Sequence, residues 1–117
     1  MRVSQALSWM VVVVLVSAGV SCAAYRARQD EYSTFLNQLA KDCKPLIIGS
    51  DDIGQAIIFN GIGAQPENYA NFLSKTQALY NGALDPDIYR QTLTAFIGSG
   101  TYNEKSYACI IAHVPKK

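Results

Sequence analysis

The sequence predicts a mainly α-helical fold: a compact bundle of four or five helices with one disulfide. Two observations indicate this. Apolar residues recur at helical spacing in several well-bounded segments after residue 24, and two cysteines in the same region are available to pair. Residues 25–117 are long enough for a single small domain with a modest core, and too short for two domains.

Residues 1–24 have the composition of a secretory signal peptide or a membrane anchor. Arg2 supplies a positive start, an apolar run follows from Trp9 to Val20, and small residues occupy positions 21–24, where a signal peptidase would cut. Cleavage after Ala23 or Ala24 fits this pattern best. The expected location of the remaining domain is therefore the periplasm.

Two alternatives to cleavage stay open. An uncleaved segment over residues 6–25 contains no charged residue and is just long enough to span a bilayer, so it would anchor the chain in the inner membrane. The chain could also be a lipoprotein attached through Cys22. Gly19 stands where such proteins usually carry a leucine-like residue, and only the small Ser21 fits their pattern.

Cys43 and Cys109 are expected to form a disulfide, because an exported domain folds in an oxidising compartment. Closing so long a loop stabilises a fold by about 4 kcal/mol in the chain-entropy model. The alternative is a metal site, since His113 follows Cys109 by four residues and would share its helical face. Two cysteines and one histidine make a thin ligand set without a familiar zinc spacing, so we expect a disulfide and no metal.

Three segments have helical periodicity with recognisable ends. The first ends before Pro45, which disfavours helical geometry at the preceding residue. The second begins with Pro66 in its first turn, and the third begins with the N-cap Asp85 and ends at Gly98. The expected helices cover residues 26–43, 66–81 and 85–97. Four tyrosines on their apolar faces are expected in the core: Tyr32, Tyr69, Tyr80 and Tyr89.

Two further segments fit either helix or strand, and they separate the bundle from its alternative, a small α+β domain. Ser50 could cap a helix running to Asn60, or residues 45–48 and 56–59 could be short strands flanking a turn. Residues 107–114 carry apolar positions that suit a helical face or a buried strand. We favour the helix there because Asn103 can cap it.

No group of residues indicates catalysis, so we expect no catalytic residues, no enzyme and no cofactor. His113 is the sole histidine and lacks a neighbouring nucleophile motif, which favours a surface or packing role. The acidic pairs at 51–52 and at 85 and 87 fall where helix N-termini favour negative charge. Residues 61–63 lack the third glycine and the context of a dinucleotide site. Nearly balanced charge gives no support to nucleic-acid binding.

The segment from Gly98 to Glu104 has the composition of a recognition loop. Two glycines precede Tyr102, and the tyrosine is followed by an amide and a carboxylate at Asn103 and Glu104. Tyrosine offers a large contact area with a polar tip, which suits protein recognition. These three residues are the predicted partner contacts. The alternative is an ordinary connection whose tyrosine folds back onto the core.

In outline the chain resembles the periplasmic immunity proteins of bacterial type VI secretion systems, particularly the helical amidase-immunity families. The resemblance rests on size, the export segment, helix order, and cysteines at the end of the first helix and in the last element, Cys43 and Cys109. It implies a dimerising protein that inserts a loop into the active-site cleft of a cell-wall-degrading toxin. By position, the inserting loop would be the one around Tyr102 or the one from Gly61 to Gln65.

The function expected from the sequence is that of an exported binding protein whose partner is another protein, such as a secreted toxin. A homodimer is compatible with this expectation. The alternative is a structural or accessory subunit of a cell-envelope assembly, held in the membrane through residues 6–25.

Overall fold

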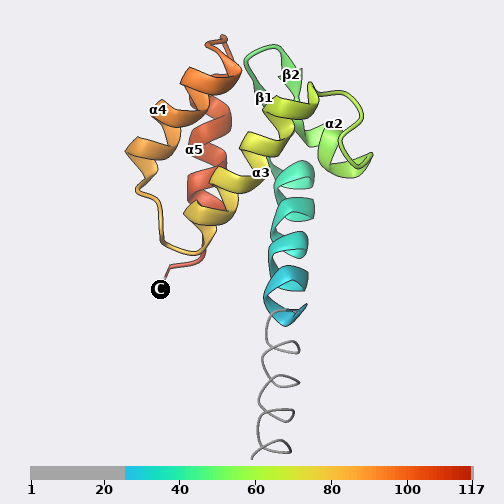
Figure 1. The fold of residues 1–117 in the computed structure, drawn as a ribbon, viewed down its shortest axis with the longest axis vertical. Coiled ribbons are helices and arrows are strands. Elements are labelled where there is room, and N and C mark those ends of the chain that lie inside the picture. Colours follow the sequence, from blue (N-terminus) through green and yellow to red (C-terminus); the bar gives the residue numbers. More distant parts are fainter. Residues whose placement is uncertain (1–25, 117) are drawn as a thin grey trace, which may run out of the picture. The chain divides into compact units, whose positions relative to one another are not determined.

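A computed structural model of the chain describes residues 26–116 (Figure 1). Residues 26–42 form the first described helix, which we call the leading helix. The other elements are β1 (Ile47–Ile48), β2 (Asp51–Asp52), α2 (Ile53–Ile58), α3 (Pro66–Tyr80), α4 (Pro86–Ile97) and α5 (Asn103–His113). The predicted signal peptide or anchor at 1–24, the span at 6–25 and Cys22 lie outside the described residues.

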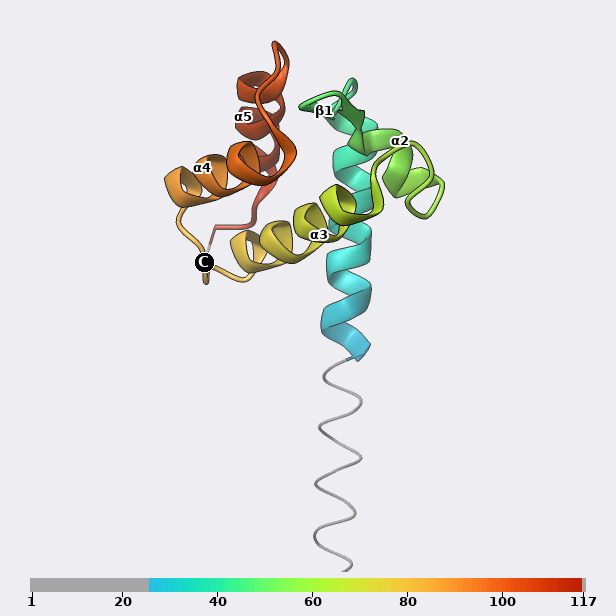
Figure 2. The same cartoon turned by 45° about the horizontal axis from the view of Figure 1, so that its top comes forward.

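The fold class is mainly α, as predicted, with a two-stranded sheet as its only strand pair among the described residues. The chain divides into two compact units, and the boundary between them follows Glu31. The second unit contains residues 32–116 of the described part, and its packing is as follows. In that unit α3 packs against α4, and α5 packs against α4 and β1. Both views place α2 and α4 on opposite sides of α3 (Figures 1 and 2). Within residues 26–116, no helix is both long and apolar enough to cross a membrane.

α3 and α4 begin at the residues that the sequence predicts, to within one residue. Pro66 is the first residue of α3, and Pro86 is the first residue of α4. Asp85 caps α4, because its carboxylate accepts a hydrogen bond from the Asp87 backbone N–H at 2.9 Å. Gly98 ends the helix with a φ of 102°, a conformation that glycine adopts without a side-chain clash.

The ambiguous segment from residue 45 to residue 60 contains both a hairpin and a helix. β1 and β2 pair antiparallel, with Ile47 opposite Asp52. Asp52 caps α2 by accepting a hydrogen bond from the Gln55 backbone N–H at 3.0 Å, so the alternative with Ser50 as the cap is wrong, and so is the alternative with a strand at residues 56–59. Ser50 lies instead in the hairpin turn beside Gly49. Gly49 has a φ of 63°, and a Cβ there would come within 2.7 Å of the Ile97 carbonyl oxygen.

The second ambiguous segment is helical throughout, because residues 107–113 belong to α5. Asn103 is the first residue of this helix, and the cap position falls to Tyr102, whose side chain makes no capping hydrogen bond. The expectation of a helix is therefore confirmed. The capping role expected for Asn103 is wrong, because its side chain makes longer-range contacts described below.

Aromatic side chains fill much of the core. Tyr89 and Tyr107 meet edge to face with ring centroids 6.0 Å apart, and both are fully buried. The Tyr89 hydroxyl shares a 2.8 Å hydrogen bond with the Thr76 hydroxyl, so the buried polar tip is satisfied. Burial raises the pKa of Tyr89 well above its ordinary value. Of the four predicted core tyrosines, Tyr32 and Tyr89 are buried, and Tyr69 and Tyr80 pack against the core while partly exposed.

The disulfide between Cys43 and Cys109 is present, which confirms the predicted pairing. It joins the end of the leading helix to α5 across a sequence separation of 66 residues. A disulfide of this kind indicates an oxidising, extracellular-type compartment.

Candidate functional site

Exposed apolar side chains gather on α2 and the loop that follows it. Ile58, Phe59 and Ile62 are 60%, 52% and 74% exposed. We call these three residues the α2 patch. Grouped large apolar side chains at a surface mark interaction sites, whereas single ones are ordinary. The α2 patch is therefore the strongest candidate site in the described part of the chain.

The patch arises because α2 is short and ends abruptly. Its buried face uses Ile53, Ala56 and Ile57, which leaves the next two apolar residues of the run on the exposed side. The Gly61 N–H bonds the Ala56 carbonyl at 2.7 Å and closes the end of the helix. Asn60 and Gly61 have positive φ angles, so the chain turns back and presents Ile62 to solvent.

Contacts with the segment before the hairpin hold α2 in place. The backbone N–H groups of Ile53 and Gly54 both bond the Leu46 carbonyl, at 2.9 and 3.3 Å. A Cβ on Gly54 would lie 3.3 Å from the Leu46 Cβ, so the absence of a side chain there permits the close approach. Buried Asp51 connects the hairpin to the end of the loop that follows α2. Its carboxylate accepts hydrogen bonds from the Gln65 N–H and the Asn68 side-chain amide.

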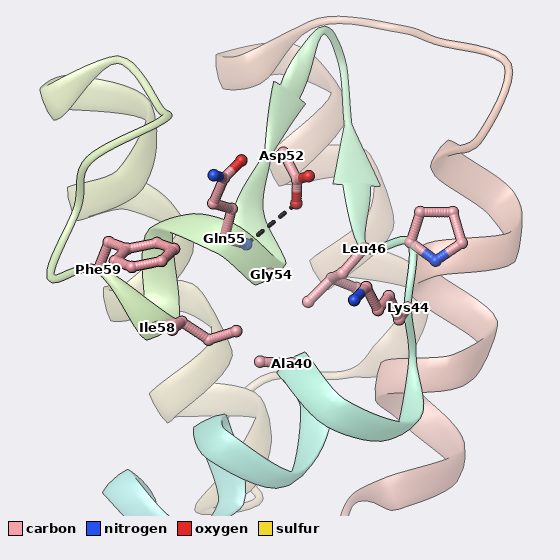
Figure 3. A pocket seen from close by; sticks show the side chains of 9 residues that line it. Ala40, Lys44, Leu46, Asp52, Gly54, Gln55, Ile58 and Phe59 are labelled. Atoms are coloured by element: carbon pink, nitrogen blue, oxygen red, sulfur yellow. Dashed lines mark hydrogen bonds between the residues drawn. The ribbon is translucent and has the colours of Figure 1, made fainter.

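A cavity of about 450 Å³ opens beside the patch. Figure 3 shows Ile58 pointing toward Ala40 of the leading helix, Phe59 at the end of α2, and Leu46 across the cavity from α2. Lys44 and Asp52 also line the cavity and bring one charge of each sign. The lining is mainly apolar, so the cavity suits an apolar side chain from a partner with a polar neighbour at its edge.

The three predicted partner contacts have different environments. Tyr102 is 48% exposed, and Glu104 is exposed with a carboxylate oxygen 3.8 Å from Arg90 Nη1. Asn103 is only 5% exposed. Its side-chain oxygen accepts from the Gly49 N–H at 2.7 Å, and its amide donates to the Gly98 carbonyl at 2.9 Å. Tyr102 and Glu104 remain predicted contacts, whereas Asn103 holds the hairpin turn against the start of α5.

One residue of the α2 patch lies in a loop that was predicted to contact a partner. Ile62 lies in the loop from Gly61 to Gln65 that the family resemblance had suggested for insertion into a partner. Ile58 and Phe59 were missed, because the apolar run from Ala56 was compatible with a buried strand. The useful signal was the length of that run, since four consecutive apolar residues exceed what one face of a helix can bury.

The other predicted acidic positions are structural. Asp52 and Asp85 cap helices, as expected from their places near helix N-termini. Asp87 lies in the first turn of α4, where the helix dipole favours negative charge. None of these carboxylates is engaged in a hydrogen bond with another carboxylate in the described contacts.

His113 lies beside the disulfide, partly exposed. Its Nδ1 is 3.8 Å from the Cys43 sulfur, 3.9 Å from the Cys109 sulfur and 2.8 Å from the Cys109 carbonyl oxygen. Its Nε2 is 3.3 Å from Asp42 Oδ2. The Gln38 side-chain amide and the neighbouring His113 hold the pKa of Asp42 below its ordinary value.

Comparisons of the chain with protein-family models, with curated proteins and with solved structures give no match.

Proposed function

We propose that this chain is an exported binding protein that recognises another protein through the α2 patch. The observation that carries the proposal is the grouping of Ile58, Phe59 and Ile62 beside an apolar cavity. Interfaces draw most of their binding energy from a few apolar or aromatic side chains that become fully buried. Phe59 and Ile62 have the character of such side chains, and the cavity can receive one from the partner.

The proposed partner is a peptidoglycan-cleaving toxin of a bacterial secretion system, and the chain is its immunity protein in the periplasm. Two features support this partner. The disulfide suits an extracytoplasmic protein, and the loop after α2 presents the apolar side chain of Ile62 with 74% of its surface exposed. An exposed loop of this kind can enter an enzyme cleft, and its occupation of the cleft would block substrate entry.

The proposal predicts that the chain inhibits a secretion-system peptidoglycan amidase, and that Phe59→Ser and Ile62→Ser each weaken inhibition at least tenfold. The physical reason is the loss of apolar burial at the centre of the interface. A tenfold loss of affinity corresponds to about 1.4 kcal/mol of binding free energy, which truncation of one such side chain can remove. Release of dye-labelled fragments from peptidoglycan measures the inhibition. The amidases tested should include any encoded beside the gene for this chain.

Ile88→Ser is the matched control, because Ile88 is 47% exposed and belongs to α4, which lies on the opposite side of α3 from α2 (Figure 1). It should leave inhibition unchanged. Failure of the unaltered chain to inhibit any of the amidases would reject the toxin partner, and undiminished inhibition by Phe59→Ser would reject the α2 patch. Sedimentation of both variants adds a further outcome, since self-association that depends on Phe59 would identify a second copy of the chain as the occupant.

A further inference from the structure

We propose that reduction of the Cys43–Cys109 disulfide converts its surroundings into a binding site for Zn²⁺. The ligands would be the two cysteine thiolates and His113 Nδ1, with water in the fourth position. In the oxidised chain the two sulfurs bond each other, so the metal site exists only after reduction. The inference is independent of the α2 patch, because it rests on a different group of residues.

The observed separations already approach those of a tetrahedral zinc site. Zn–S bonds of about 2.3 Å and Zn–N bonds of about 2.0 Å place a sulfur and a nitrogen ligand roughly 3.6 Å apart. His113 Nδ1 lies 3.8 Å from one sulfur and 3.9 Å from the other. Two sulfur ligands would be about 3.8 Å apart, so the main change on reduction is separation of the sulfurs. These three ligand atoms lie together in the described part of the chain.

Asp42 supplies the support that zinc-bound histidines usually have. A histidine that binds zinc through one ring nitrogen commonly donates its other N–H to a carboxylate, which fixes the ring and its tautomer. With Nδ1 on the metal, Nε2–H of His113 would donate to Asp42 Oδ2, which is 3.3 Å away. Gln38 in turn donates to the same carboxylate oxygen. The carboxylate that would orient His113 is thus in place before any metal binds.

A dithiol reductant opens the disulfide in two successive thiol–disulfide exchanges. A thiolate of the reductant attacks Sγ of Cys109, the more exposed of the two residues, and the Cys43 thiolate leaves. The second thiolate of the reductant then releases Cys109, so the reductant becomes a disulfide and the chain gains two thiols. Binding of Zn²⁺ displaces the two thiol protons. Nδ1 can bind the metal only without a proton, so the proton that it shares with the Cys109 carbonyl passes to solvent and the ring carries its single proton on Nε2.

The metal can reach the site from solvent. The His113 and Asp42 side chains are 30% and 37% exposed, and Cys109 is partly exposed, whereas Cys43 is buried. An entry path on one side and a buried ligand on the other are what a stable protein site requires. The site would therefore be open to exchange with external zinc.

Titration with Co²⁺, followed by absorption, tests the inference. The full chain in mild detergent would carry Cys22→Ser, so that Cys43 and Cys109 are its only thiols, and would be reduced by a water-soluble phosphine without oxygen. We expect one Co²⁺ per chain, a thiolate-to-cobalt charge-transfer band and the intense visible bands of tetrahedral cobalt, all removed by Zn²⁺. The oxidised chain should show none of these bands.

Two variants separate the site from ordinary thiol binding. His113→Ala should weaken the reduced chain's affinity for the metal at least tenfold, and Asp42→Asn should weaken it by about tenfold, because the carboxylate that orients the histidine ring is lost. Circular dichroism of both variants in the oxidised form should match the unaltered chain. Equal cobalt affinity in His113→Ala, or a spectrum without tetrahedral bands, would overturn the inference. A reduced chain that unfolds and is not refolded by Zn²⁺ would overturn it as well.

Discussion

Replacing Cys43 and Cys109 together with alanine should lower the free energy of unfolding by about 4 kcal/mol. The cross-link spans 66 residues, and its removal restores the conformational entropy of that loop to the unfolded chain. Alanine keeps the small size of both side chains, so the loss of packing is minor. Urea denaturation monitored by circular dichroism gives the free energy, in buffer with a metal chelator.

The reduced unaltered chain is the matched comparison for the double variant, because both lack the cross-link. Their unfolding free energies should agree within about 1 kcal/mol, the usual size of a modest side-chain effect. The slope of free energy against urea should also increase, since an unfolded chain without the cross-link exposes more surface. A loss of less than 1 kcal/mol would show that the core, and not the disulfide, holds α5 to the leading helix.

Asn103→Ala should lower the free energy of unfolding by about 2 to 3 kcal/mol. The change removes the acceptor of the Gly49 N–H and the donor to the Gly98 carbonyl, and leaves both backbone groups without their side-chain partner in a partly buried place. Thermal and urea unfolding measure the loss. Faster amide hydrogen exchange at Gly49 would locate the effect in the hairpin turn.

Tyr102→Ala is the control for this prediction, because Tyr102 is adjacent to Asn103 in the sequence and its side chain is half exposed. It should change the free energy of unfolding by less than about 0.5 kcal/mol, as surface substitutions do. If Tyr102 contacts a partner, the same variant should weaken binding. The reverse outcome, a stable Asn103→Ala and an unstable Tyr102→Ala, would contradict the structural role of Asn103 and place Tyr102 in the core.

Local chemistry explains which parts of the fold could be predicted from the sequence. Pro66 and the Asp85-Pro86 pair act within one helical turn, so the starts of α3 and α4 could be predicted from their neighbours alone. The disulfide could be predicted because only two cysteines follow residue 24. Strands of two residues show no measurable periodicity, so β2 at Asp51–Asp52 was missed, and the strand alternative placed its second strand at residues 56–59, most of which belong to α2.

The candidate sites depend on contacts between distant residues, and this limited their prediction. Asn103 meets Gly49 across 54 residues, so its burial has no signature in the adjoining sequence. Asp42 meets His113 only because the disulfide and core packing bring the leading helix to α5. The helical spacing of Cys109 and His113 could be predicted, whereas the carboxylate that completes their surroundings could not.

The placement of the α2 patch outside the core has an evolutionary consequence. Ile58, Phe59 and Ile62 contribute little to the buried core, so substitutions there carry small stability costs. The backbone beneath them is held by hydrogen bonds to the Leu46 carbonyl and to Asp51, and these bonds do not involve the side chains of the patch. A lineage under pressure from a changing partner could therefore alter its specificity repeatedly while keeping the same scaffold.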